Sequence, residues 1–169
     1  NISHELNIGN NEYRKQWKTL YNLSVDEIKN LLKKLGHGFY YFYGESDVIK
    51  ESKIVLKEAS ENSLTRKDEG ALVSTEEADP PIILVKSDGS YLYLTTDLGT
   101  VYFREKNFNV DKYLYVVDER QSNHFAQVFS TVKHFKLSDK DFFHISYGTV
   151  NGKDGKPLKT RDGGTYKLE

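Results

Sequence analysis

The amino-acid sequence predicts an α/β fold, because strand and helix patterns alternate along its second half. Residues 112–117 form a mostly apolar run typical of a buried strand, residues 122–134 have helical spacing, and residues 142–147 form a second strand pattern. This order is typical of a parallel sheet whose strands are joined by helices. The first half instead mixes helices, short strands and a hairpin. We therefore expect an α+β segment before about residue 90 and half of a doubly wound sheet after it.

Two helices are expected near the start of the chain. Apolar residues three and four apart predict an amphipathic helix over residues 12–21. Ser24 and Glu27 have the spacing of a capping box, so a new helix is expected to begin at Ser24. Gly36 is of the residue type that commonly ends a helix. The expected order is therefore helix, break, second helix and stop.

Between the second helix and residue 111 the patterns change every few residues. Aromatic or apolar runs bounded by Gly, Pro or Asp predict strands, and charged stretches with apolar residues inside predict helices. The expected strands are 39–43, 70–73, 82–86 and 91–95, and the expected helices are 49–64 and 97–106. A Ser-Asp-Gly-Ser turn at residues 87–90 is expected to join the last two strands as a hairpin.

The composition excludes several classes of protein. With 169 residues, 37% hydrophobic and 29% charged, the chain can bury a core and is neither fibrous nor broadly disordered. The absence of Cys excludes disulfides and thiolate metal sites. A net charge of -1 gives no general attraction to phosphate backbones, so RNA contact would need a local patch or another domain.

Targeting signals are also missing from the sequence. No apolar run approaches the roughly 18 residues of a membrane span, and the first residues do not resemble a signal peptide. We therefore expect a cytoplasmic protein with no membrane partner. Because the sequence contains no Met, we also expect it to be a segment of a longer chain.

The most suggestive segment for chemistry is the loop at residues 152–164. It places Lys153, Lys156, Lys159 and Arg161 on a Gly-bearing stretch that follows a predicted strand. Loops at the carboxyl ends of parallel strands bind ligands in such folds, and mobile cations suit a polyphosphate. A solvated basic loop is the alternative, and the Walker A pattern is absent.

Two further pairs of residues stand at predicted junctions between strands and helices. Tyr93 and Asp97 are four apart, and Asp97 could either cap the following helix or hold a cationic ligand such as a guanidinium. His124 and Gln127 are three apart on one helix face, directly after a strand. A lone helical His is usually structural, and no further residues at suitable spacing favour a metal.

Four blocks of the sequence, at 91–98, 115–121, 124–127 and 152–161, resemble consecutive blocks of the arginyl-tRNA synthetases in order and spacing. The likeness extends from about Trp17 to the end of the chain. It implies the second half of a class I Rossmann-type nucleotide-binding fold with an α+β connective insertion. Residues 1–80 would be largely insertion, and residues 81–169 would belong to the catalytic fold.

The resemblance also implies roles for individual residues. Those matched to the arginine site are Tyr93, Asp97 and Gln121; those matched to the ATP site are His124, Gln127, Gly148 and Val150; and those in the catalytic loop are Lys153, Lys156 and Lys159. The loop departs from the usual Lys-Met-Ser-Lys-Ser signature, because Pro157 and Thr160 occupy the two lysine positions. Neither the His-Ile-Gly-His signature nor an anticodon-binding domain is present in this sequence.

The function implied is that of a fragment of an arginine–tRNA ligase, which uses ATP and Mg²⁺ to activate arginine and transfers it to tRNA(Arg). The isolated fragment is expected to be inactive, because half of the ATP site is elsewhere. A synthetase-like binding or regulatory module without ligase activity is the alternative. A class I synthetase for another amino acid is less consistent with an anionic Asp97 in the pocket.

Overall fold

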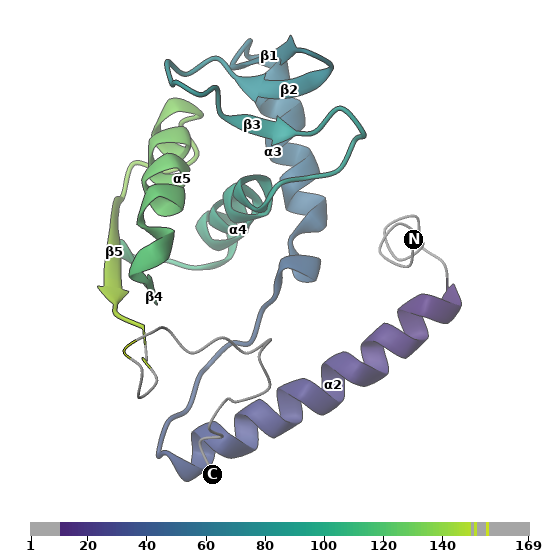
Figure 1. Cartoon of the computed structure of the whole chain (residues 1–169), viewed down its shortest axis with the longest axis vertical. Coiled ribbons are helices and arrows are strands. Elements are labelled where there is room, and N and C mark those ends of the chain that lie inside the picture. The colour runs from purple at the N-terminus through teal and green to yellow at the C-terminus, as the bar shows by residue number, and fades with distance from the viewer. Residues whose placement is uncertain (1–10, 150, 152–154, 156–169) are drawn as a thin grey trace. The chain divides into compact units, whose positions relative to one another are not determined.

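The structure is a computed structural model that describes residues 11–149, 151 and 155 (Figure 1). The chain divides into two compact units, and within the described residues the boundary falls between Phe42 and Tyr43. Residue 80, expected to separate the insertion from the catalytic fold, thus lies inside the second unit, and that division stays a prediction. No helix in the described ranges is long and apolar enough to cross a membrane.

Helix α2, Asn11–Lys34, forms most of the described part of the first unit. The expected break at Ser24 is wrong, because the helix runs through this residue without interruption. Neither Gly nor Pro lies near Ser24, so nothing forces the backbone out of the helix. The expected stop is confirmed: Gly36 has a φ of 74°, and the amide of His37 donates to the Leu32 carbonyl at 2.9 Å.

The strand expected at residues 39–43 is also wrong. In the described part of the chain this aromatic segment pairs with no strand, and its backbone is irregular. The short 3-10 helix η1, Glu45–Asp47, follows it, and the amide of Gly44 donates to the Asp47 carboxylate at 2.8 Å. Helix α3, Ile49–Glu61, then confirms the helix expected from residue 49.

Three short strands form an antiparallel sheet in the order β1-β2-β3. They are β1, Thr65–Asp68; β2, Ala71–Ser74; and β3, Ile83–Val85. Strands β2 and β3 confirm the expected apolar runs. Strand β1 was not expected, because its sequence Thr-Arg-Lys-Asp has no apolar alternation, and pairing with β2 determines its conformation.

Helix α4, Tyr93–Asn107, begins earlier than the sequence pattern indicated. The strand expected at residues 91–95 is reduced to a single bridge between Val85 and Tyr91. Leu92 is the N-cap, and its carbonyl accepts the amide of Thr95 at 3.0 Å. The hydroxyl of Thr95 donates to the Leu84 carbonyl at 2.6 Å, which ties the helix start to β3.

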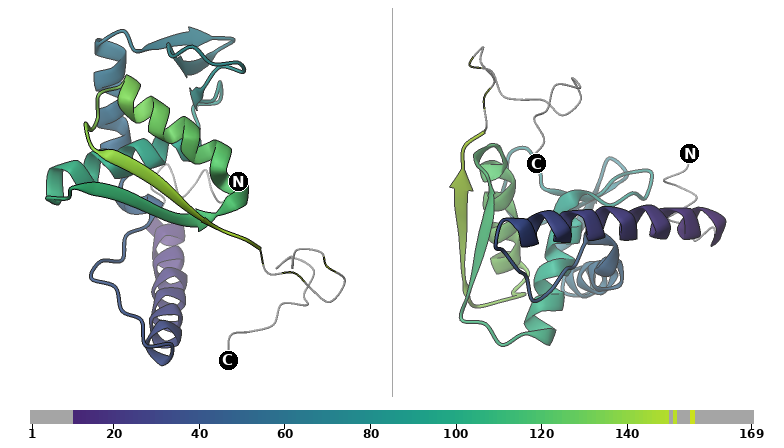
Figure 2. Two further views of the ribbon diagram at one scale, coloured as in Figure 1. Left: turned by 90° about the vertical axis from the view of Figure 1, so that its left-hand side faces the viewer. Right: turned by 90° about the horizontal axis from the view of Figure 1, so that it is seen from below.

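The second half of the chain has the expected strand–helix–strand order. Strand β4, Lys112–Asp118, is followed by the short helix η2, Glu119–Gln121, then by α5, Ser122–His134, and by β5, Asp141–Tyr147. Strands β4 and β5 pair in parallel from Lys112↔Asp141 to Asp118↔Tyr147. Both views in Figure 2 show the two strands side by side, with α5 against one face. This β–α–β unit is characteristic of α/β folds.

The core of the second unit joins helices from both halves of the chain. Figure 1 shows α4 between α3 and α5. Gly99 permits the close crossing of α4 and α3, because a Cβ atom there would lie 2.8 Å from the backbone nitrogen of Ser52. The main buried apolar residues of this core are Val55, Leu56, Ala59, Ile82, Leu84, Leu94, Leu98, Val101, Val128, Val132 and Phe135.

The carboxylate of Glu105 holds the last turn of α4 against the β4–β5 region. It accepts hydrogen bonds from the Tyr113 hydroxyl at 2.7 Å, from the Ser138 hydroxyl at 2.8 Å and from the Lys140 ammonium at 3.1 Å. Burial acts to raise the pKa of Glu105, but these three donors outweigh it and hold the pKa below its ordinary value. The carboxylate is therefore stabilised in its charged form.

Candidate functional site

Some of the described residues singled out in the sequence lie at or just after the carboxyl ends of strands β4 and β5. Asp118 and Tyr147 are register partners at the ends of the two strands. Gln121 lies in η2, directly after β4, and Gly148 directly follows β5. In α/β folds this edge is where ligands bind.

Tyr93 and Asp97 lie one turn apart on helix α4 rather than across a strand–helix junction. Tyr93 is 73% exposed, whereas the side chain of Asp97 is half-buried. Because Leu92 is the N-cap and Asp97 is inside the second turn, the alternative that Asp97 caps this helix is wrong. Its carboxylate is therefore free of a capping role.

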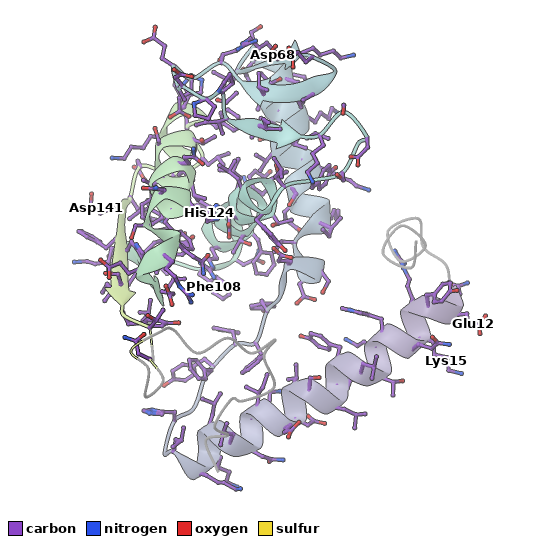
Figure 3. All side chains as sticks on the ribbon, viewed as in Figure 1. Glu12, Lys15, Asp68, Phe108, His124 and Asp141 are labelled. Atoms are coloured by element: carbon purple, nitrogen blue, oxygen red, sulfur yellow. The ribbon has the colours of Figure 1, made fainter. Side chains whose placement is uncertain are left out.

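The carboxylate of Asp97 pairs instead with a histidine from the next helix. The Nε2 atom of His124 lies 2.6 Å from Oδ2 of Asp97, and each side chain is only 28% exposed. Figure 3 labels His124 on α5, on the side toward α4. The structure thus brings together one residue expected at the arginine site and one expected at the ATP site.

Tyr115 adds a buried hydroxyl near this pair that the sequence patterns did not single out. The residue is 9% exposed, its hydroxyl oxygen is buried, and the guanidinium of Arg104 lies 5.5 Å from the centroid of its ring. Burial raises the pKa of Tyr115; the nearby Arg104 charge opposes that rise and the Asp97 charge adds to it. Its inward position on the alternating strand β4 was the signal that could have identified it.

An ion pair shapes the turn that carries Gln121. Asp118 at the end of β4 accepts the backbone amide of Arg120 at 2.8 Å and two guanidinium hydrogen bonds, each at 2.9 Å. These hydrogen bonds hold the pKa of the Asp118 carboxyl below its ordinary value. Asp118 therefore has a structural partner, and the local turn from β4 into α5 is well determined.

A second carboxylate approaches the start of α4 from a distant part of the sequence. The Thr96 hydroxyl donates to Oε1 of Glu45 at 3.2 Å, and to the carbonyl of Tyr93 at 2.8 Å. Glu45 lies in the 3-10 helix η1, and we assigned it no role at the site from the sequence. The tertiary contact between η1 and α4 places it against the first turn of α4.

Some of the remaining expected site residues are exposed on the surface, and the others lie outside the described part of the chain. Gln121, Gln127 and Gly148 are exposed, and a Cβ atom at Gly148 would meet no atom within 4 Å among those described. Within the same described residues there is no group of three or more His, Cys, Asp or Glu that could hold a metal ion. Val150, Lys153, Lys156 and Lys159 lie outside the described residues, as does most of the 152–164 loop.

The parallel β4–α5–β5 unit, with polar residues at the carboxyl ends of its strands, is characteristic of a domain of the α/β class. The family model for "tRNA synthetases class I (R), catalytic domain" matches residues 1–169. The chain therefore belongs to the catalytic domain family of the class I arginyl-tRNA synthetases. This finding confirms the resemblance on which the expected fold class was based.

Curated relatives and a solved structure agree with the family assignment. The chain is 41% identical over 168 residues to an arginine–tRNA ligase of Francisella tularensis subsp. novicida, covering 97% of this chain and 29% of that protein. It is 39% identical over 173 residues to an arginine–tRNA ligase of Alkaliphilus oremlandii, with 98% and 30% coverage.

Among solved structures, the arginyl-tRNA synthetase of Plasmodium falciparum matches with a TM-score of 0.78 and 26% identity. The match covers 88% of this chain and 27% of that chain. The present chain thus spans about 29% of the length of the first curated relative. The match to the solved structure confirms the expected fold over most of the length of this chain.

Proposed function

We propose that this chain is part of an arginine–tRNA ligase, which activates arginine with ATP and transfers it to tRNA(Arg) in the cytoplasm. The observation that carries the proposal is the half-buried carboxylate of Asp97, which lies beside the polar edge and does not cap its helix. The relatives named as arginine–tRNA ligases support the same amino acid.

The arginine side chain would bind against helix α4. A guanidinium has five N–H donors in one plane and pairs best with carboxylates. His124 contacts Oδ2 of Asp97, which leaves Oδ1 able to accept from the substrate. The exposed ring of Tyr93 lies one turn away, Glu45 can supply a second carboxylate, and Gln121 can contact the polar end of the amino acid.

ATP would bind at the carboxyl edge of β4 and β5. His124 and Gln127 project from the first turns of α5, and the open space beside Gly148 allows close approach of an adenine to the backbone. The backbone at Val150 is assigned to the same side by resemblance. Mg²⁺ would accompany the phosphates of ATP, whose oxygens are ligands that it prefers.

The chemistry proposed for this site needs positioning rather than a general base. ATP supplies an adenylyl group, and its pyrophosphate is the leaving group when an oxygen of the arginine carboxylate forms the new bond to the α-phosphorus. Lys153, Lys156 and Lys159 would stabilise the negative charge that develops on pyrophosphate. A tRNA hydroxyl then attacks the arginyl carbonyl, and AMP leaves.

Substitution of Asp97 by Asn in the complete enzyme tests the arginine site. Asn keeps the shape but removes the charge, so arginine binding should weaken by about 2–4 kcal/mol, because a charge-assisted pair in a partly desolvated site is lost. The Michaelis constant for ATP should change little. The measurement is arginine-dependent exchange of pyrophosphate into ATP over a range of both substrates.

Asp111→Asn provides a matched control, since it makes the same chemical change at an exposed residue outside the proposed site. It should leave both Michaelis constants unchanged. Unaltered arginine kinetics in Asp97→Asn would remove the main physical support for the proposed arginine site.

A further inference from the structure

We propose that His124 is a positioning residue for arginine recognition: its imidazole holds the Asp97 carboxylate in the orientation that receives the guanidinium. The inference rests on the proposed function, because it assigns a role within the same site. It also goes beyond the expectation from resemblance, in which His124 belongs to the ATP side alone.

The geometry of the pair is that of a strong hydrogen bond. A distance of 2.6 Å between His124 Nε2 and Asp97 Oδ2 is short for a nitrogen donor and a carboxylate acceptor. Both side chains are 28% exposed, so the pair is partly shielded from water. The two residues are 27 positions apart and lie on different helices, so tertiary packing alone produces the contact.

The Asp97 carboxylate needs such a partner if it is to bind a planar cation in one orientation. An aspartate side chain on a helix can turn about two bonds, and fixing it before the ligand arrives lowers the entropic cost of binding. In the described part of the chain, His124 is the residue that hydrogen-bonds this carboxylate. With Oδ2 engaged, Oδ1 is the acceptor presented to the substrate.

The imidazole is itself held by a rigid element. His124 lies in the first turn of α5, and the adjacent Phe125 is buried and contacts the His124 ring edge-on at a centroid distance of 5.2 Å. Further along the helix, Val128 and Val132 are fully buried in the core that α5 shares with α4. The backbone that carries His124 is therefore fixed relative to Asp97.

A positioning role predicts how the effects of substituting His124 and Asp97 on arginine binding combine. If His124 acts on arginine only through Asp97, then removing its imidazole should matter only while the carboxylate is present. The two effects should consequently be non-additive, which a double-mutant cycle measures directly. A residue that contacted only ATP would not alter arginine binding measured without ATP.

The experiment is a calorimetric measurement of the arginine dissociation constant for the complete enzyme without ATP. We compare the wild type with His124→Leu, Asp97→Asn and the double variant. His124→Leu should weaken arginine binding about tenfold, but by less than about twofold in the Asp97→Asn background. His124→Gln keeps an N–H donor at similar reach, so it should recover most of the affinity.

Matched controls separate this role from general damage to the helix. His134 lies at the other end of α5, where its Nε2 is 3.1 Å from the Thr75 hydroxyl, and His134→Leu should leave arginine binding unchanged. Thermal unfolding checks that each variant is folded. If His124→Leu is not, His124→Asn replaces it, since its shorter amide cannot reach Oδ2 in the same way.

The outcomes distinguish this inference from the proposed function. An unchanged dissociation constant in His124→Leu, or additive effects in the double variant, would overturn the positioning role while leaving Asp97 at the arginine site. An unchanged dissociation constant in Asp97→Asn would overturn the proposed arginine site, and this inference with it.

Discussion

Helices α2 and α4 differ in how much of each is buried. Helix α4 buries six of its 15 residues, whereas α2 has 24 residues and none that is buried. In α4, Leu94 and Leu98 are within the core, while in α2, Leu20 and Leu23 are more than half exposed. Periodicity thus predicts that a helix forms, and burial depends on the elements that pack against it.

The largest difference in stability is expected when the same substitution, Leu to Ala, is made in each of the two helices. Leu98 is fully buried, so Leu98→Ala should reduce the free energy of unfolding by about 2–5 kcal/mol through lost burial and a cavity. Leu23 is 63% exposed, and Leu23→Ala should change stability by about 0.5 kcal/mol or less. Urea unfolding measures both, and equal losses would contradict the comparison.

Gly99→Ala tests the close crossing of α4 with α3. Ala has a higher helix propensity than Gly by about 1 kcal/mol. A Cβ atom at this position would lie 2.8 Å and 2.9 Å from the backbone nitrogen and Cα of Ser52, so α3 must shift. We expect the clash to prevail, with a net loss of about 1–3 kcal/mol in thermal or urea unfolding.

Ser52→Ala serves as the companion variant in this test. It removes the Ser52 hydroxyl but leaves the backbone atoms that meet the new Cβ. Adding it to Gly99→Ala should therefore not restore stability. A stabilised Gly99→Ala protein would mean that the two helices separate at little cost.

Glu105→Gln should reveal a pH-dependent contribution from the last turn of α4. The pKa of Glu105 is lowered in the folded protein, so its contribution is present above its ordinary value of 4.5 and is lost as the pH falls through the folded value. At neutral pH the substitution should cost about 1–2 kcal/mol, since charged hydrogen bonds are weakened.

The measurement is urea unfolding of both proteins between about pH 3 and pH 7. The difference in the free energy of unfolding should shrink toward the acidic end. A difference that stays constant with pH would show that the Glu105 charge is not what stabilises this turn.

The smallest expected effect distinguishes the capping-box interpretation of α2 from the continuous helix. If Ser24 began a helix, Ser24→Ala would destabilise it by about 1 kcal/mol. Inside a helix, Ala is favoured over Ser by about 0.5 kcal/mol. We therefore expect a small increase in helix stability, measured by amide hydrogen exchange of residues 20–28 compared with the wild type.

Much of the fold could be predicted from local patterns, and the failures have physical causes. Helix α5 was predicted at its observed bounds because its apolar spacing agrees with the packing around it. Strand β1 was missed because a polar edge strand depends on its partner, and the strand at residues 39–43 was wrong because no described strand pairs with it. Helix α4 begins earlier than the local pattern predicted, because the Thr95 hydroxyl donates a hydrogen bond to the carbonyl of Leu84, 11 residues earlier in the chain.

By itself, the sequence determined the α/β class, the family and the residue types available for binding, because these depend on local periodicity and on the order of short blocks. The tertiary structure decided which of those residues meet. The pairing of Asp97 with His124 and the approach of Glu45 to Thr96 join segments 27 and 51 positions apart. Such contacts require the packing of α4 against its neighbours, which no local pattern in the sequence specifies.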